Sequence, residues 1–333
     1  MEKPIRCAVL GLGRLGYWHA ENVASKVKGA KLVCVADPQT GHAAKVAGEL
    51  GVDRYTGNLN EVFEDDSIDA VVIASPTSTH ADMITQAARN GKHIFVEKPL
   101  TVDLQEASDV LRVIEETKVV CQVGFMRRFD PAYAEAKKRI ARGDIGKPIY
   151  YKGVSRDPGS PPAEFIKNSG GIFLDLGIHD YDLARFLLEA EVTSVAAHGS
   201  VLVHGFMEEF GDVDQGIAYA TFDSGAAADI ECSRNAYYGY DIRGEVIGTE
   251  GTLLIGSLRH RDISVLTFKG SSQDIVPDFP TRFESAYVLE MQHFVDCLLN
   301  GQKPSVTAED GKKALEIAVT AKKAFETGSR VQL

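Results

Sequence analysis

The first third of the chain alternates short apolar runs with longer amphipathic segments. An apolar run of about four to eight residues that ends in turn residues is typical of a buried strand, and apolar residues at helical spacing predict a helix. Strands that alternate with helices predict a doubly wound parallel sheet, an α/β fold of the Rossmann type. The expected strands are 5–10, 31–36, 69–75, 93–96 and 119–123, and helices are expected after the first strand through residue 27, at 79–89 and at 103–116.

After Gly124 the pattern changes. Several strand-like runs follow one another with only short turns between them, which predicts a mostly antiparallel sheet. With the helices around it, this sheet predicts an α+β second domain, so the expected domains are 1–124 and 125–333, and the last helix is expected to pack back on the first domain. The expected elements are helix 131–142, strand 148–155, helix 175–189, strands 192–203, 215–222, 226–232, 240–247 and 252–255, and helices 285–299 and 308–327.

Length, charge and cysteine spacing narrow the class of protein. A chain of 333 residues exceeds the size at which one hydrophobic core stops growing, which favours two domains. The net charge of -11 disfavours nucleic acid as a partner. No apolar run reaches the ~20 residues of a membrane span and the N-terminus lacks a signal-peptide pattern, so a cytoplasmic location is expected. The five cysteines are widely spread and are expected to be buried apolar side chains, not disulfides or metal ligands.

A glycine-rich turn follows the first expected strand and opens the first expected helix. Its glycines permit the tight turn, the approach of a dinucleotide pyrophosphate, and the close packing of helix and strand. Asp37 ends the second strand about 20 residues later, where its carboxylate can bind both ribose hydroxyls and would repel a 2′-phosphate. This arrangement predicts NAD, in preference to NADP, as the cofactor. The expected cofactor contacts are Gly11, Gly13, Arg14, Leu15, Gly16 and Asp37.

Two further loops are expected to line the cofactor, because ligands of open parallel sheets bind beyond the carboxyl ends of the strands. One loop follows the strand at 69–75, and the other begins at Glu97. His19 and His80 are expected on a helix surface or in a cofactor loop rather than in catalysis. The contacts expected from the two loops are Ser75, Pro76, Thr77, His80, Glu97 and Lys98.

A polar stripe is expected on the helix at 175–189. Asp175, His179 and Asp182 are spaced by four and then three residues, and so share one face of that helix. Oxidation of a secondary alcohol requires a base for the hydroxyl proton, and histidine is the side chain that ordinarily titrates near neutral pH. His179 is therefore the candidate base, with Asp175 to orient its ring. Lys98 is the candidate hydrogen-bond donor to the reacting oxygen.

Other interpretations of these residues stay open at this level. An Asp and a His four residues apart also form exposed helix pairs that contribute only a few tenths of a kcal/mol. Both are metal ligands as well, but no third and fourth ligand of suitable spacing accompanies Asp175 and His179, so no metal is expected. Lys98 alone is equally consistent with a solvated side chain at a strand end.

The order of these motifs resembles the Gfo/Idh/MocA oxidoreductase family from end to end. The resemblance rests on the glycine turn, on Glu97-Lys98-Pro99, and on a Gly-Gly-x-x-x-Asp-x-x-x-His segment that ends at His179. It implies that NAD is the cofactor, that Lys98, Asp175 and His179 are the catalytic set, and that the bond before Pro99 is cis.

Within that family, three segments are similar to those of inositol 2-dehydrogenases, which convert myo- or scyllo-inositol and NAD to the inosose and NADH. The segments are 124–130, 155–158 and 178–182. The resemblance also implies a homotetramer formed through the open face of the second sheet. Other activities within reach of the pattern are an NAD-dependent aldose dehydrogenase, an NAD-dependent glycosidase, and a non-catalytic NAD-binding sugar sensor. The substrate contacts implied are Arg128, Asp157, Asp182 and, less directly, Tyr238.

Overall fold

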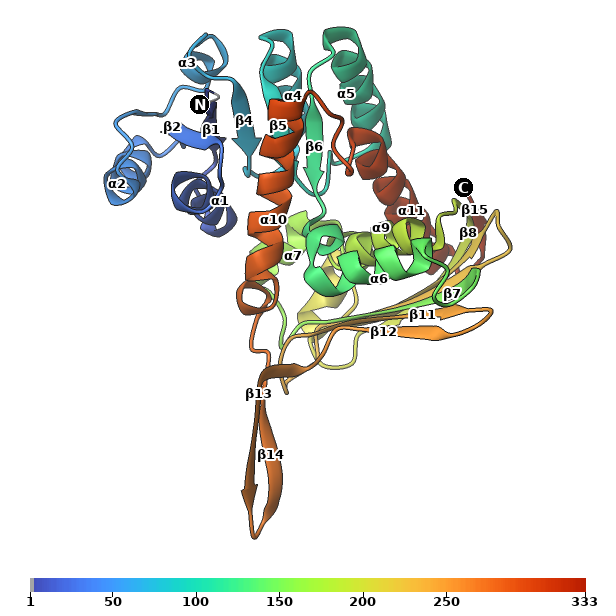
Figure 1. Ribbon diagram of the computed structural model, residues 1–333. Coiled ribbons are helices and arrows are strands. Elements are labelled where there is room, and N and C mark those ends of the chain that lie inside the picture. Colours follow the sequence, from blue (N-terminus) through green and yellow to red (C-terminus); the bar gives the residue numbers. More distant parts are fainter. Residues whose placement is uncertain (1–2) are drawn as a thin grey trace. The chain divides into compact units, whose positions relative to one another are not determined.

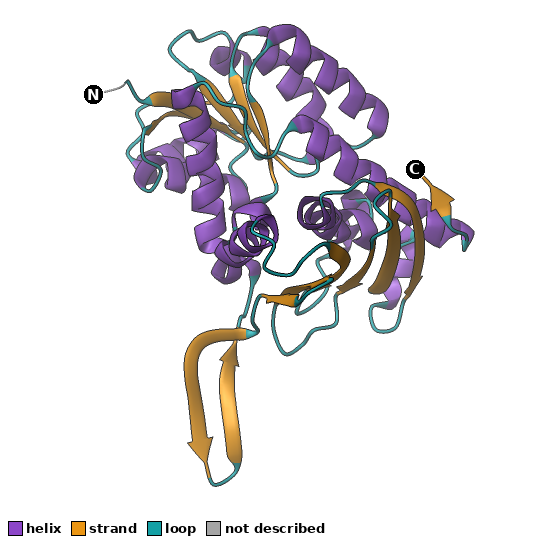
Figure 2. Ribbon diagram, turned by 45° about the vertical axis from the view of Figure 1, so that its right-hand side comes forward, coloured by secondary structure: helices purple, strands orange, loops and turns teal. Residues whose placement is uncertain are grey.

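The computed structural model describes residues 3–333, which fold into two compact units. The first unit contains the described residues through Met126 together with Ser285–Lys313, and the second contains Arg127–Glu284 and Ala314–Leu333. Helices and strands alternate in the first unit, whereas strands gather in the second (Figures 1 and 2). Two helices late in the chain, α10 (Phe279–Asn300) and α11 (Ala308–Thr327), contribute residues to both units.

The first unit is built on a six-stranded sheet in which all neighbouring strands are parallel. The strand order is β3-β2-β1-β4-β5-β6, which is the order of a Rossmann domain. Val9, Val72 and Phe95 on the central strands are fully buried, as expected for parallel strands covered on both faces. The predicted doubly wound sheet is confirmed. The strands are β1 (Ile5–Leu10), β2 (Ala30–Ala36), β3 (Tyr55–Thr56), β4 (Ala70–Ile73), β5 (His93–Glu97) and β6 (Cys121–Gly124).

The helices of the first unit pack their apolar faces on this sheet. Ala20 of the first helix and Phe294 of α10 lie in one core cluster with Val9 and Phe95. The predicted helices are present within a few residues of their expected bounds. No element was expected in residues 40–63, where the structure has two helices and an edge strand. The helices are α1 (Arg14–Ser25), α2 (Thr40–Leu50), α3 (Asn60–Phe63), α4 (His80–Arg89) and α5 (Leu104–Thr117), with a 3-10 turn η1 (Thr77–Thr79) before α4.

The second unit is built on a seven-stranded sheet with the order β12-β11-β7-β10-β9-β8-β15. Only β7 and β10 pair in parallel; the other neighbours are antiparallel. The predicted mostly antiparallel sheet is therefore confirmed. Its strands are β7 (Pro148–Arg156), β8 (Val192–Ser200), β9 (Gln215–Phe222), β10 (Ala227–Ser233), β11 (Asp241–Gly248), β12 (Thr252–Ile255) and β15 (Val331–Gln332).

One face of this sheet carries the core of the second unit. Tyr133, Tyr181 and Leu183 from the covering helices are almost fully buried against it. Along β9 the side chains alternate: Ala218 and Ala220 point into the core, whereas Ile217 and Tyr219 are exposed. The helices are α6 (Pro131–Ala141), α7 (Ala163–Ser169), α8 (Ile172–Asp175) and α9 (Gly177–Leu188), with 3-10 turns η2 (Met126–Phe129) and η3 (Gly205–Phe210).

Several elements of this unit were not expected, among them α7, η3 and β15, and two other differences concern longer segments. The helix expected at 175–189 is two consecutive helices, α8 and α9, separated by a turn at Leu176, so Asp175 ends one helix and His179 lies in the next. A hairpin of β13 (Arg259–Thr267) and β14 (Gly270–Ile275) was not predicted, because almost every residue in it is exposed and no core-facing periodicity marks it.

The last helix is divided between the two units. Its residues through Lys313 belong to the first unit, and from Ala314 onward α11 belongs to the second unit, where Ile317, Ala318 and Ala321 join the core cluster. The terminal strand β15 then pairs with β8 of the second sheet. The helix α10 packs on the nucleotide-binding sheet, where Met291, Phe294 and Val295 join the core cluster of the first unit.

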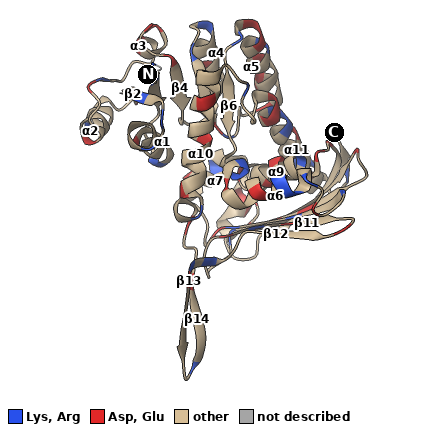
Figure 3. Cartoon of the chain, viewed as in Figure 1, with Lys and Arg blue, Asp and Glu red and all other residues tan. Residues whose placement is uncertain are grey.

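Three observations concern the chain as a whole. None of the helices within residues 3–333 combines the length and the apolar character that crossing a bilayer would require. All five cysteines are free thiols with buried side chains, as expected. Basic and acidic residues are interspersed in both units (Figure 3).

Candidate active site

The glycine turn between β1 and α1 has the sterics that dinucleotide binding requires. Gly11 has a φ of 85°, and a Cβ there would lie 2.8 Å from the backbone of Ser75. A Cβ on Gly16 would lie 1.8 Å from the carbonyl oxygen of Gly11. At Gly13, in contrast, no described atom lies within 4 Å of an added Cβ. Two glycines are thus needed for packing, and the third leaves open space next to the N-terminus of α1.

Substituting these glycines separates packing from binding. Gly16→Ala forces a methyl group into the Gly11 carbonyl and is expected to destabilise the first unit by about 1–3 kcal/mol. Gly13→Ala has room for its methyl group and is expected to change stability by less than about 1 kcal/mol while weakening NAD binding, because the methyl occupies the space of the pyrophosphate. Urea unfolding followed by Trp18 fluorescence and calorimetric titration with NAD measure the two effects. Equal stability losses in both variants would contradict this assignment.

Asp37 is fixed beside the glycine turn. Its Oδ2 accepts a hydrogen bond from the Leu12 amide at 2.9 Å, and its Oδ1 accepts one from the Gln39 amide at 2.9 Å. The carboxylate is therefore held at the carboxyl end of β2, the position from which a Rossmann domain binds the adenosine ribose. A 2′-phosphate at this position would face a negative charge.

The loops after β4 and β5 are tied together by His80. One ring nitrogen lies 2.9 Å from the carbonyl oxygen of Pro99, the other 3.0 Å from that of Ser75, and the side chain is 1% exposed. Burial lowers the pKa of His80 against the opposing effect of these carbonyls. His80, which was predicted to contact the cofactor, is a buried residue whose ring contacts the loops after β4 and β5. The bond between Lys98 and Pro99 is cis, as the family resemblance implied.

Glu97 points into the interior of the first unit. Its Oε1 lies 2.7 Å from Nε2 of His19, and its Oε2 accepts a hydrogen bond from the Lys98 amide at 3.3 Å. His19 was expected on a helix surface or in a cofactor loop, but only 1% of it is exposed. The expectation failed because α10, which begins 260 residues later in the chain, covers that face of α1.

In the second unit, Arg234 joins two of the predicted carboxylates. Its Nη2 lies 3.1 Å from Oδ2 of Asp175 and its Nη1 lies 3.4 Å from Oδ2 of Asp157, and the guanidinium side chain is fully buried. Arg234 directly follows β10. The sequence analysis missed it, and the signal that could have found it is a lone Arg at the end of an apolar strand.

The helix α9 carries buried polar side chains, so the interpretation of Asp175 and His179 as a solvated helix pair is wrong. His179 is 6% exposed, and Asp180 is fully buried. Asp180 accepts hydrogen bonds from Arg127 Nη1 at 2.9 Å, from Tyr151 Oη at 2.9 Å and from Ser155 Oγ at 2.5 Å. This network, of which the sequence analysis predicted no member, fixes the segment of α9 that holds His179.

The predicted substrate residues each contact other charged or polar side chains of the second unit. Arg128 and Asp182 form a buried two-pronged ion pair, with Nε to Oδ2 at 2.7 Å and Nη2 to Oδ1 at 2.5 Å. Tyr238 is 46% exposed, and its hydroxyl contacts Arg156 and Asp241. Asp157 and Asp175 both contact Arg234, Arg128 pairs with Asp182, and Tyr238 contacts Arg156 and Asp241.

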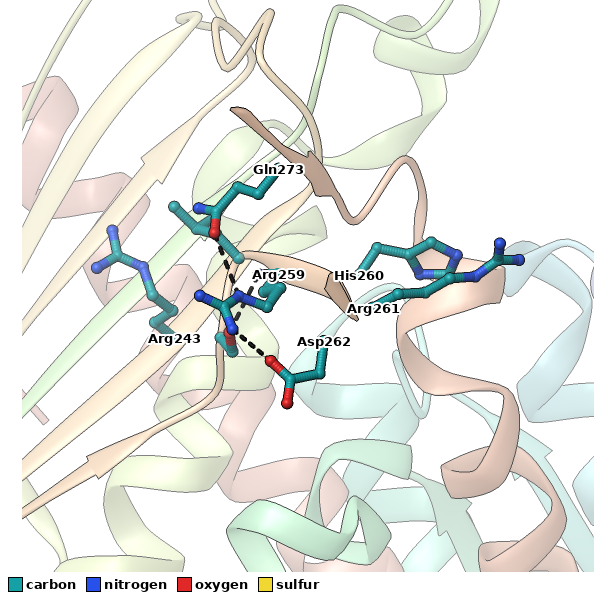
Figure 4. A pocket seen from close by; sticks show the side chains of 8 residues that line it. Arg243, Arg259, His260, Arg261, Asp262 and Gln273 are labelled. Atoms are coloured by element: carbon teal, nitrogen blue, oxygen red, sulfur yellow. Dashed lines mark hydrogen bonds and ion pairs between the residues drawn. The ribbon is translucent and has the colours of Figure 1, made fainter. Parts of the chain in front are cut away.

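A surface cavity lies at the base of the hairpin in the second unit (Figure 4). Arg243, Arg259, His260 and Asp262 are among its lining residues. Arg259 pairs with Asp262, and its Nε donates a hydrogen bond to Oε1 of Gln273 at 3.2 Å. None of the predicted site residues lines this cavity.

The parallel sheet, the glycine turn and Asp37 define the first unit as a dinucleotide-binding Rossmann domain, and the chain as a Rossmann domain joined to an α+β domain. The chain belongs to the Gfo/Idh/MocA oxidoreductase family. Its NAD-binding Rossmann fold matches residues 5–125, and its C-terminal alpha/beta domain matches residues 137–333. The resemblance inferred from the motifs is confirmed.

Relatives match the chain over its full length. The scyllo-inositol 2-dehydrogenase (NAD(+)) of Bacillus subtilis is 60% identical over 333 residues, covering 100% of this chain and 97% of that protein. The myo-inositol 2-dehydrogenase of Thermotoga maritima is 39% identical, covering 99% and 98%. The crystal structure of scyllo-inositol dehydrogenase from Lactobacillus casei with bound NAD(H) and scyllo-inositol superposes with a TM-score of 0.94 at 35% identity, covering 99% of each chain.

Proposed function

We propose that the chain is an NAD-dependent inositol 2-dehydrogenase, which oxidises one secondary hydroxyl of scyllo- or myo-inositol to the ketone. The observation that carries the proposal is the 60% identity over 333 residues with a scyllo-inositol 2-dehydrogenase. The open space at Gly13 and the fixed Asp37 carboxylate fit NAD. Bound NAD supplies the hydride acceptor. The same proposal places the enzyme in the cytoplasm, where its five free thiols stay reduced.

His179 and Lys98 handle the hydroxyl proton in this proposal. As the carbinol C–H bond breaks and its electron pair leaves with the hydride, the O–H proton passes to the His179 imidazole. Lys98 donates a hydrogen bond to the same oxygen and stabilises its developing negative charge. Asp175, held by the buried Arg234, orients the His179 ring and stabilises the imidazolium. The products are the inosose, NADH and a proton.

Recognition of the polyol uses the charged groups of the second unit. Carboxylates and guanidinium groups make paired hydrogen bonds with vicinal hydroxyls, which suits a ring that carries a hydroxyl on every carbon. The candidates are Arg128, Asp157, Asp182 and Tyr238. The burial of the Arg128–Asp182 pair supports this role. A buried ion pair keeps the carboxylate lone pairs and the guanidinium N–H groups in fixed directions.

An NADH absorbance screen tests the proposed function. Scyllo-inositol, myo-inositol and other inositol isomers, a panel of aldoses, and 2-hydroxy acids are each supplied with NAD and, separately, with NADP. We expect NADH formation with scyllo- or myo-inositol, and at least about tenfold lower kcat/KM with NADP, because the Asp37 charge opposes a 2′-phosphate. Absence of NADH with every inositol isomer would refute the proposal.

The proposal includes a homotetramer that covers the open face of the second sheet. Ile149, Ile217, Tyr219 and Leu254 on this sheet are between 39% and 80% exposed. The hairpin of β13 and β14 extends away from the rest of its unit (Figure 1), and its Leu266 and Phe268 are 77% and 96% exposed. A two-stranded hairpin is marginally stable in water, and exposed apolar patches mark contact surfaces.

Light scattering after gel filtration measures the assembly. The wild type is expected at four times the 36.1 kDa chain mass, and Ile217→Asp with Tyr219→Asp is expected to give smaller species, because burying carboxylates in an interface is unfavourable. The double change Lys45→Asp with Glu49→Lys, on an exposed helix of the first unit, is the control and should leave the mass unchanged. A monomeric wild type would refute the tetramer.

A further inference from the structure

Three polar side chains from distant parts of the sequence meet inside the first unit. His19 on α1, Glu97 at the end of β5 and Glu290 on α10 are 1%, 5% and 0% exposed. A nitrogen or oxygen atom from each lies within 4.8 Å of those of the other two. The rings of Phe95 and Tyr287 lie next to His19, with centroids 5.1 and 5.9 Å away. We refer to His19, Glu97 and Glu290 as the buried acid cluster.

The buried acid cluster is short of hydrogen-bond donors. Glu97 has partners for both of its carboxyl oxygens: Oε1 lies 2.7 Å from Nε2 of His19, and Oε2 accepts a hydrogen bond from the Lys98 amide at 3.3 Å. Both carboxyl oxygens of Glu290 lack a hydrogen-bond partner anywhere in residues 3–333, as does the amide oxygen of Gln122. The Gln122 amide nitrogen already donates to the Glu290 carbonyl oxygen at 2.9 Å. Buried acceptors without donors are costly, and one added proton on a carboxyl group supplies a donor.

Electrostatics favour the same added proton. Two carboxylates buried this close to one another repel, which favours a proton on one of them. Among the described residues, His19 from α1 and Glu97 from β5 lie close to the Glu290 carboxyl group, the Tyr287 ring contacts His19, and the Gln122 amide on β6 donates to the Glu290 carbonyl oxygen. Burial first, and the negative charge of Glu97 second, raise the pKa of Glu290 well above its ordinary value.

We propose that Glu290 is held as a neutral carboxylic acid, directs its proton toward the carboxyl group of Glu97, and thereby acts as a positioning residue for Lys98. The connection runs from Glu290 to Glu97 and then to the backbone amide of Lys98. Gly124 on β6 limits the Glu97 carboxyl group from the other side, since a Cβ there would lie 3.1 Å from its atoms. Only the consequence for turnover rests on the proposed function. A closed metal site ordinarily uses four protein ligands, and this cluster offers three, two of them already hydrogen-bonded to each other.

The pH dependence of unfolding tests the protonation itself. Trp18, the single tryptophan, lies on α1 beside His19 and reports on this unit. A neutral Glu290 must release its proton on unfolding at any pH above the unfolded pKa of about 4.3. Stability of the wild type therefore falls with rising pH in this window, up to the folded pKa, whereas Glu290→Gln lacks this loss. The ratio of unfolding constants, wild type over E290Q, is expected to rise by up to about tenfold per pH unit between pH 5 and 8.

The ratio of unfolding constants also shows when the proposal is wrong. A ratio that stays flat or falls with pH would mean that Glu290 is ionised in the folded protein, and would overturn the proposal. The infrared spectrum gives a second reading: the wild type at neutral pH should show the carbonyl stretch of a protonated carboxyl group that E290Q lacks. A stoichiometric divalent cation in the purified protein that E290Q fails to retain would also overturn it.

Turnover tests the positioning of Lys98. Glu290→Ala is expected to lower kcat by about tenfold or more with little change in NAD affinity, because Glu97 loses its support and Lys98 shifts. Glu290→Gln, which keeps the shape and an N–H donor, is expected to restore kcat to within a few-fold and to extend activity to higher pH. Glu49→Gln on the exposed side of α2 is the matched control and should change nothing.

The outcomes separate the two proposals. An unchanged kcat in E290A would refute the positioning role, while the unfolding ratio and the infrared band still decide whether Glu290 is protonated. A wild type that forms no NADH from any inositol would refute the proposed function and leave those two measurements of Glu290 unaffected.

Discussion

Replacing His179 with Ala is expected to lower kcat for inositol oxidation by about 10²–10⁴-fold, the usual contribution of a general base. The hydride cannot leave the carbinol carbon readily unless the hydroxyl proton has an acceptor, and His179 is the buried imidazole that α9 holds in place. Lys98→Ala is expected to cause a loss of similar size, because the developing negative charge on the oxygen loses the hydrogen bond that stabilises it. NADH absorbance measures turnover, and calorimetric titration measures NAD affinity, which should change by no more than a few-fold.

The control for these variants is Lys45→Ala. Lys45 lies on α2 of the first unit, its side chain is 71% exposed, and its pairing with Glu49 is a surface contact. This substitution removes the same charge and should leave both kcat and NAD affinity unchanged. Normal turnover in both His179→Ala and Lys98→Ala would remove these residues from the mechanism. Loss of NAD binding in parallel with turnover would instead assign Lys98 to cofactor binding.

Replacing Arg127 with Met is expected to destabilise the second unit by about 3–5 kcal/mol, because it leaves a buried carboxylate without its charge partner. Arg127 and Asp180 are 3% and 0% exposed at their side chains, and their charged atoms lie 2.9 Å apart. The Tyr151 and Ser155 hydroxyls remain as neutral donors to Asp180. Calorimetry should show the melting temperature of this unit lowered by about 10 °C.

The matched control is Arg139→Ala on α6. Arg139 is 48% exposed at its side chain and pairs with Glu135 one turn earlier, so its loss should cost less than about 1 kcal/mol. A second variant, Asp180→Asn, keeps the shape of the side chain and removes its charge, which leaves Arg127 buried and unpaired and should also be destabilising. An Arg127→Met variant with unchanged stability would show that the two hydroxyl donors alone are sufficient to stabilise the Asp180 charge. Asp180 directly follows His179 in the sequence. We therefore also expect a reduced kcat in the folded Arg127→Met protein, because the segment of α9 that holds His179 is less well fixed.

Local sequence patterns were sufficient to predict the nucleotide-binding half of the site. The steric needs of Gly11 and Gly16 arise within a single strand, turn and helix, and Asp37 follows at a fixed distance along the same unit. The roles of these residues could be predicted because the short-range backbone geometry of a strand, turn and helix restricts which residues fit at each position. The buried roles of His80 and Glu97 could not be predicted in this way, since the carbonyls and the imidazole that they contact come from other loops.

The second unit shows the same limit more strongly. The order of its strands could not be predicted, since β7 pairs with β10 and β11 rather than with its neighbour in sequence. As a result, Arg234 after β10 was not connected with Asp157 after β7, although the structure places them 3.4 Å apart. The hairpin of β13 and β14 was missed because its side chains face no core and so carry no periodic signal.

The sequence by itself determined the class of fold, the cofactor and the candidate catalytic residues, because periodicity, glycine turns and motif order are encoded over short stretches of chain. The tertiary structure alone decided which polar groups are buried and with which partners. His19 and Glu97 are 78 residues apart in sequence and 2.7 Å apart in space, and Glu290 reaches them from a helix near the end of the chain. Burial and ionisation depend on such long-range packing, since the cost of a charge is set by everything that surrounds it.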